Sequence, residues 1–184
     1  AESAMTPPRV LVAAVQSPFS GGGAERHVRR LTEELVARGI EADLVTIPLI
    51  ERTRFDLLRS ALAWRSLDLE EVAGRPVDAV IATRFPSYVV RHPNKIAWVI
   101  HQYRQAYDQF GTPWSDFSSS TEDRRTRETI AAVDRLGPPG APLMARPAGS
   151  VVLAGTRDDL RIGLDRLSGA PAADPALGTG VRIR

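Results

Sequence analysis

The run Arg9-Val-Leu-Val-Ala-Ala-Val15 is continuously apolar after its first residue, and it ends at Gln16. Such a run is typical of a strand that is buried on both faces of a parallel sheet. The segment Ser17-Pro-Phe-Ser-Gly-Gly-Gly23 follows at once, and its glycines predict a loop between this strand and the next element. The stretch therefore indicates the beginning of an α/β domain.

The residues after the glycines predict a helix, because the apolar positions recur at helical spacing. These positions are Val28, Leu31, Leu35 and the flanking Val36. Gly39 is well placed to end the helix in a left-handed cap. Residues 42–47 then predict a second strand that stops at Pro48. We therefore expect a strand, loop, helix and strand unit over residues 9–47.

The same alternation continues along the chain. The pattern predicts a helix over 54–67, strands over 77–82 and 95–100, and a helix over 126–136 that starts near Ser118-Ser-Ser-Thr-Glu122. The apolar positions expected to face the core from the first of these helices are Leu57, Leu58, Ala61, Leu62 and Leu67, with Trp64 left unassigned. Alternating strands and helices predict a Rossmann-like open parallel sheet with helices on both faces.

The chain of 184 residues has room for one domain and a remnant. We assign residues 9–136 to the Rossmann-like domain, and residues 1–8 to a disordered leader or a remnant of cloning. Residues 137–184 are rich in Gly, Pro and Ala, which predicts an irregular linker and tail; within it, 150–155 predict a strand and 158–167 a helix. A truncation, omitted stretches or a shifted reading frame would each explain this tail.

The composition excludes several classes of protein. The chain has no cysteine, so it has neither disulfides nor thiolate metal sites. No apolar run approaches the roughly 20 residues of a transmembrane helix, and we expect a cytoplasmic protein. Residues 1–136 hold 18 Lys+Arg against 18 Asp+Glu. Because no basic block is present, we expect no nucleic-acid partner.

Ligands of open α/β sheets bind just outside the carboxyl ends of the strands, and three predicted strand ends carry suitable residues. The loop Gly21-Gly-Gly23 lets the backbone approach a ligand and precedes a helix N-terminus that favours phosphate. Arg84 follows the strand 77–82 and has the geometry to bind an anionic group. His101 and Gln102 follow the strand 95–100, where a histidine stabilises developing charge. A plain turn, a solvated arginine and a structural histidine are the alternative interpretations.

Other nucleotide and metal motifs are missing. Arg26 stands where the dinucleotide fingerprint needs its third glycine, and the P-loop signature is absent. Ile47-Pro48 ends the second strand in place of the acidic residue of a nicotinamide enzyme. His27 and His92 lack the spacing of a metal site, so we expect no metal and no cofactor.

Three parts of the sequence form a more specific combination. They are Pro8-Arg-Val-Leu-Val-Ala-Ala-Val15, then Gly22-Gly-Ala-Glu-Arg-His-Val28, then Arg91-His-Pro-Asn-Lys-Ile-Ala-Trp-Val-Ile-His-Gln-Tyr-Arg104 with Ala106-Tyr-Asp108 and Gly111-Thr112. Together they resemble the amino-terminal domain of a family 4 glycosyltransferase over residues 8–136. The resemblance implies a GT-B enzyme that transfers a sugar, with retention of configuration, from a nucleoside diphosphate sugar to a carbohydrate or lipid-linked acceptor.

The resemblance also implies roles for particular residues. His101 is expected to be the catalytic histidine beside the transferred sugar. The residues expected to contact the donor phosphates or the acceptor are Gly21, Gly22, Gly23, Arg84, Gln102, Arg104 and Tyr107. Oriented polar groups and dipoles, without a metal, suit the charge that such a transition state develops.

The sequence departs from this family after residue 136. The carboxy-terminal domain that holds the donor nucleotide, with its E-x7-E motif, is not found. We therefore expect this chain alone to bind a donor poorly and to transfer little sugar. The alternative function is a non-catalytic Rossmann-like module that binds an anion or nucleotide, or a partner subunit completed by a second chain.

Overall fold

The computed structural model describes residues 6–98, 103–136 and 151–153. In this part of the chain, parallel strands form one open sheet in the order β2-β1-β5-β6-β7. The strands are β1 (Arg9–Gln16), β2 (Glu41–Pro48), β5 (Ala79–Ala82), β6 (Lys95–Trp98) and β7 (Val151–Leu153). The predicted parallel α/β fold is confirmed.

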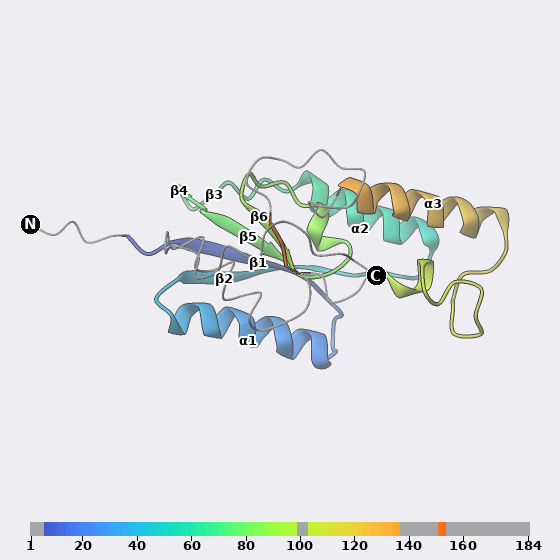
Figure 1. Ribbon diagram of the computed structural model, residues 1–184, viewed down its shortest axis with the longest axis horizontal. Coiled ribbons are helices and arrows are strands. Elements are labelled where there is room, and N and C mark those ends of the chain that lie inside the picture. Colours follow the sequence, from blue (N-terminus) through green and yellow to red (C-terminus); the bar gives the residue numbers. More distant parts are fainter. Residues whose placement is uncertain (1–5, 99–102, 137–150, 154–184) are drawn as a thin grey trace, which may run out of the picture.

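Helices cover both faces of the sheet (Figure 1). Helix α1 (Gly23–Ala37) lies on one face, and α2 (Arg54–Ser66) and α3 (Thr121–Leu136) lie together on the other. The chain also has two short 3-10 turns. The first, η1 (Ser87–Val89), follows β5, and the second, η2 (Arg104–Ala106), precedes α3. Strand β1 serves both layers: alternate residues pack in a cluster with α1 and in a second cluster with α2 and α3.

The first unit follows the sequence closely. Residues 10–15 of β1 are all buried, and Val28, Leu31 and Leu35 form the buried stripe of α1. Gly39 has φ +79°, a conformation that favours glycine. The backbone of this helix end therefore turns as predicted, and β2 runs parallel to β1 from Arg9 opposite Glu41 to Gln16 opposite Pro48.

Helix α2 corrects the sequence prediction at three positions. Trp64, which the apolar spacing does not assign to the core, has a relative exposure of 0%, whereas Leu62 is 64% exposed. Leu67 lies beyond the last helical residue as the C-cap. The buried positions Leu57, Ala61 and Trp64 stand at i, i+4 and i+7, which places them on one stripe. Leu62 lies one residue further round the helix than Ala61, so its side chain lies outside this stripe.

A small hairpin was not predicted. Strands β3 (Glu71–Val72) and β4 (Arg75–Pro76) pair antiparallel across Ala73 and Gly74, both of which have positive φ. Two consecutive residues of positive φ are the requirement of a type I′ turn. The sequence showed the Gly-Arg-Pro break but not the pairing, because each strand is only two residues long.

Part of the tail joins the domain. Val151–Leu153 pairs parallel with Ile96–Trp98 of β6, so the strand expected over 150–155 is present in its central residues and lies at the edge of the sheet. The helix expected over 158–167 lies outside the described residues. Among the helices that the structure describes, none has the length and apolar character needed to cross a membrane.

Candidate functional site

The candidate site lies at the carboxyl ends of β1, β2 and β5. Strand β1 pairs with β2 on one side and with β5 on the other. The chain therefore adds β2 on one side of β1 and its later strands on the other side. In open α/β sheets this switch point leaves a crevice in which ligands bind. The loop after β2 stays close to the end of β1, because the Leu49 amide donates to the Gln16 carbonyl at 3.0 Å.

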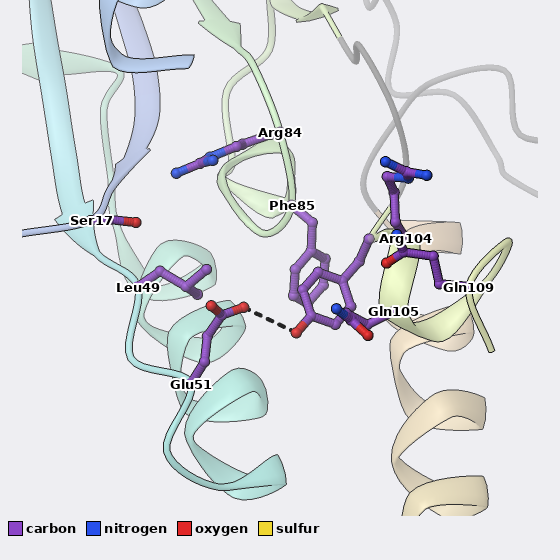
Figure 2. A pocket seen from close by; sticks show the side chains of 9 residues that line it. Ser17, Leu49, Glu51, Arg84, Phe85, Arg104, Gln105 and Gln109 are labelled. Carbon is purple, nitrogen blue, oxygen red and sulfur yellow. Dashed lines mark hydrogen bonds between the residues drawn. The ribbon is translucent and has the colours of Figure 1, made fainter. Parts of the chain in front are cut away.

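A pocket of about 200 Å³ opens at this edge (Figure 2). Its walls come from the segments after β1, β2 and β5 and from the segment that contains η2. The lining residues are Ser17, Leu49, Glu51, Arg84, Phe85, Tyr103, Arg104, Gln105 and Gln109. The volume lies below the roughly 300–1,000 Å³ of sites for larger ligands, so the pocket fits a fragment of about one ring.

One wall of the pocket is built by Glu51 and Tyr103. The Tyr103 hydroxyl donates to Glu51 Oε1 at 3.0 Å, which is the dashed contact in Figure 2. The Tyr103 ring packs against Phe85 with 5.2 Å between the ring centroids. Burial, and then the charge of Glu51, raises the pKa of Tyr103 well above its ordinary value, so its hydroxyl stays protonated and remains a donor.

Arg84 lies between the end of β1 and the first turn of α1. Its Nη2 donates to the Val15 carbonyl at 2.9 Å and lies 3.6 Å from Glu25 Oε1. The Glu25 carboxylate therefore has a guanidinium beside it. Because a carboxylate at a helix N-terminus would otherwise weaken the attraction of that end for an anion, Arg84 keeps the N-terminus of α1 suited to a phosphate.

The glycine loop leads directly into that helix end. Gly22 is the N-cap and provides no side-chain acceptor for the first amides of α1, which leaves these donors to another partner. A Cβ at Gly21 or Gly23 would meet no atom of the described chain within 4 Å, whereas one at Gly22 would come within 3.0 Å of Glu25 Oε2. Packing within the described chain therefore does not require glycine at 21 or 23.

The segment around η2 is held by the loop that follows it and by α3. Gln105 accepts from the Asp116 amide at 2.7 Å through its side chain, and its carbonyl accepts from the Ser115 hydroxyl at 3.1 Å. Arg127 of α3 donates to the Ala106 carbonyl at 2.8 Å. These contacts fix the backbone from which Arg104 and Gln105 face the pocket.

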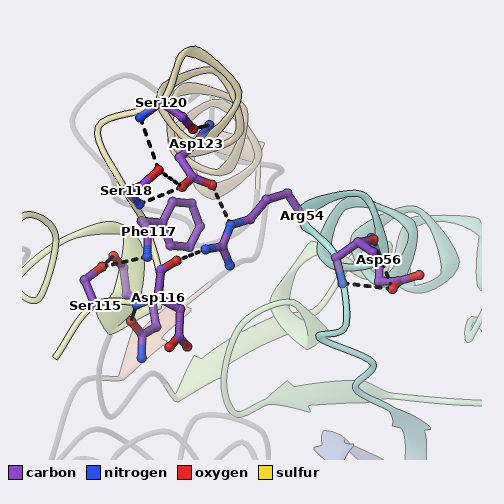
Figure 3. Close-up of polar contacts among 10 residues, drawn as sticks. Arg54, Asp56, Ser115, Asp116, Phe117, Ser118, Ser120 and Asp123 are labelled. Atoms are coloured by element: carbon purple, nitrogen blue, oxygen red, sulfur yellow. Dashed lines mark hydrogen bonds and ion pairs between the residues drawn. The ribbon is translucent and has the colours of Figure 1, made fainter.

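Arg54 and Asp123 join α2 to α3 (Figure 3). Arg54 Nε lies 2.6 Å from Asp123 Oδ1, and another of its nitrogens donates to the Asp116 carbonyl. The guanidinium also lies 4.0 Å from the centre of the Phe117 ring, a cation–π distance. Asp123 Oδ2 accepts from both the amide and the hydroxyl of Ser118 at 2.6 Å.

The Tyr107 side chain contacts α3, and its expected role beside a ligand stays a prediction. Its hydroxyl donates to the buried carboxylate of Asp134 on α3, which also accepts from Tyr88. Tyr107 is not among the described residues that line the pocket. It anchors the η2 segment to α3, while Arg104, expected in the same role, lines the pocket and pairs with Asp108 at 3.0 Å.

The histidines that the structure describes have structural surroundings. His92 contacts the Val77 carbonyl through Nε2 at 3.1 Å and accepts from the Asn94 amide. The His27 ring meets Trp98 edge-on at 4.7 Å. In the described ranges no group of three His, Asp or Glu residues is arranged to hold a metal ion. His101 and Gln102 lie outside the described residues, so their expected roles stay predictions.

The structure therefore brings Arg84 and Arg104 to one pocket, with the glycine loop beside Arg84. The sequence did not identify the other lining residues as site residues, which are Ser17, Leu49, Glu51, Phe85, Tyr103, Gln105 and Gln109. Leu49 and Glu51 follow the end of β2 at Pro48, so the preference of ligands for strand ends is the signal that points to them. No family model, curated protein or solved structure matches the chain.

Proposed function

We propose that this chain is the acceptor-side domain of a retaining glycosyltransferase, which moves a sugar from a nucleoside diphosphate sugar to a carbohydrate or lipid-linked acceptor. The observation that supports this most is the pocket at the ends of β1, β2 and β5, open beside the uncapped N-terminus of α1. A site for a hydroxyl-bearing ring next to a site for phosphate is the arrangement that sugar transfer needs.

The two parts of the site have separate tasks. The amides of the first turn of α1 and the helix dipole attract the diphosphate of the donor, and Arg84 neutralises Glu25 so that this attraction persists. The side chains of the pocket orient the acceptor. His101 is proposed as the residue beside the transferred sugar, on the ground of the sequence resemblance alone.

The proposal is tested by calorimetric titration of the chain with UDP-glucose and GDP-mannose. We expect weak, millimolar binding, because the amides of the first turn of α1 contact only the diphosphate part of the donor. Gly21→Val should raise Kd at least about tenfold, corresponding to about 1.4 kcal/mol. The variant should fold normally, because its new side chain meets no atom of the described chain within 4 Å at Cβ.

Ser119→Val is the matched control, since Ser119 is an exposed loop residue on a different segment. It should bind as the original chain does. Failure of both nucleotide sugars to bind, or equal binding by Gly21→Val, would contradict the proposal. Binding of inorganic pyrophosphate as tightly as either nucleotide sugar would favour the alternative of a plain anion-binding module.

A further inference from the structure

The charges around the pocket are nearly balanced within the chain. Arg84 has Glu25 at 3.6 Å, and Arg104 has Asp108 at 3.0 Å. Glu51 adds a carboxylate to the wall and has Tyr103, a neutral donor, as its hydrogen-bond partner. Counting these neighbours, three carboxylates lie around the two guanidinium groups. Both guanidinium groups therefore already have a carboxylate beside them, and a ligand with a phosphate or carboxylate group would also approach Glu51, which is unfavourable for like charges.

The hydrogen-bonding groups that remain suit hydroxyl groups. Glu51 uses Oε1 for Tyr103, and among the described residues its second oxygen has no hydrogen-bond donor, so it can accept from a ligand. Gln105 uses its side-chain oxygen for the Asp116 amide, and its NH2 group has no acceptor within the described part of the chain, so it can donate to a ligand. Ser17 and Gln109 line the same space. Each of these groups pairs well with a hydroxyl, which both donates and accepts.

The apolar part of the wall favours a ring. Phe85 and Tyr103 lie side by side with 39° between their planes, and Leu49 also lines the space. Apolar surface of this kind covers the C–H face of a ring while the polar groups bind at its edge. We infer that the pocket selects a neutral polyhydroxylated ring over an anionic one, and that Glu51 orients a hydroxyl of that ring.

This inference rests on the proposed function, because it names the acceptor class of the same site. Glu51 is a specificity-determining residue in it. Glu51→Gln keeps an oxygen that can accept from Tyr103 and removes the negative charge. The variant should therefore bind a neutral ring less tightly and an anionic ring more tightly, an exchange that mere loss of local structure would not produce.

The test measures binding by saturation-transfer NMR with methyl α-D-glucopyranoside, methyl α-D-mannopyranoside and myo-inositol, against glucose 6-phosphate and mannose 6-phosphate. We expect at least one neutral ring to bind several-fold more tightly than either phosphate. Glu51→Gln should weaken that binding roughly tenfold, the loss of one charge-assisted hydrogen bond, and should improve phosphate binding. Glu70→Gln, an exposed carboxylate on another segment, should change neither.

Preferred binding of the phosphates, no binding of any neutral ring, or equal weakening of both classes in Glu51→Gln would overturn the inference. The same samples are titrated with UDP-glucose and GDP-mannose. If these nucleotide sugars bind in a manner that depends on Gly21 while the neutral rings do not bind, only the inference fails. If neither class binds, the proposed function fails as well.

Discussion

Replacing Asp123 by Asn tests the contacts of Asp123 with Arg54 and Ser118, which join α2 to α3. Asp123 accepts from the Ser118 hydroxyl at 2.6 Å and lies 2.6 Å from Arg54 Nε. These contacts hold the pKa of Asp123 at about 2, against an ordinary 3.8. At about 1.4 kcal/mol for each tenfold change in an equilibrium, the difference corresponds to at most about 2.4 kcal/mol of stability. The Arg54 side chain keeps some exposure to solvent, and solvent screens the ion pair. We therefore expect Asp123→Asn to lower the free energy of unfolding by about 1 to 2 kcal/mol.

The pH dependence of this loss of stability shows whether it comes from the ionised carboxylate of Asp123. The folded-state pKa of Asp123 is lowered, so its contribution is complete above the ordinary pKa and is lost as the pH falls through about 2. The stability difference between the original chain and Asp123→Asn should therefore be constant from pH 7 to about pH 5 and decline to about half near pH 3. Urea unfolding at these pH values measures it.

Glu128→Gln is the matched control on the same helix, because Glu128 is exposed; it should change the unfolding free energy by less than about 0.5 kcal/mol. A loss in Asp123→Asn that is as large at pH 3 as at pH 7 would refute the ionic explanation. An unchanged free energy of unfolding at pH 7 would refute the contribution of the Asp123 contacts to stability.

Three further predictions concern the core, the buried carboxylate and the glycine loop. Trp64→Ala should cost about 3–5 kcal/mol in urea unfolding because Trp64 is fully buried, while Leu62→Ala, at an exposed position of the same helix, should stay within about 0.5 kcal/mol; similar losses in both would contradict the packing. Burial raises the pKa of Asp134, so its stabilising contribution is present below the ordinary pKa and is lost as the pH rises. From about pH 4 to pH 7, the free energy of unfolding of Asp134→Asn should therefore improve relative to that of the original chain. The opposite trend would show that Tyr88 and Tyr107 stabilise the anion. Gly23→Ala should leave the melting temperature unchanged or raise it by the equivalent of about 0.4–1 kcal/mol, because its Cβ meets no atom of the described chain within 4 Å; a clear fall in melting temperature would mean that the position requires glycine for folding.

The parallel sheet was predictable from the sequence, because β1 and β5 are buried on both faces and their apolar runs show it directly. Trp64 was harder to place, since its position depends on which stripe of α2 faces α3 and η1. The hairpin β3–β4 depends on two residues of positive φ, and alanine at one of them gives no signal in the sequence.

The candidate site was predictable only in part. Arg84 and the glycine loop could be found because each follows a recognisable buried strand. Glu51 could not be ranked, because its importance comes from its contact with Tyr103, which is 52 residues away in the sequence. The hydroxyl of Tyr107 is held by Asp134, 27 residues further along the chain, and the motif around Tyr107 gives no sign of this contact. Contacts between distant segments decide such roles, and local patterns do not show them.

The most direct test of the account is to map amide chemical shifts over the whole chain during titration with UDP-glucose and methyl α-D-glucopyranoside together. The largest changes should fall at Gly21–Gly23, Glu51 and Arg84, the segments that follow β1, β2 and β5. Changes that are largest at the opposite edge of the sheet, around the hairpin Glu71–Pro76, or that are absent from all of these segments, would contradict the account.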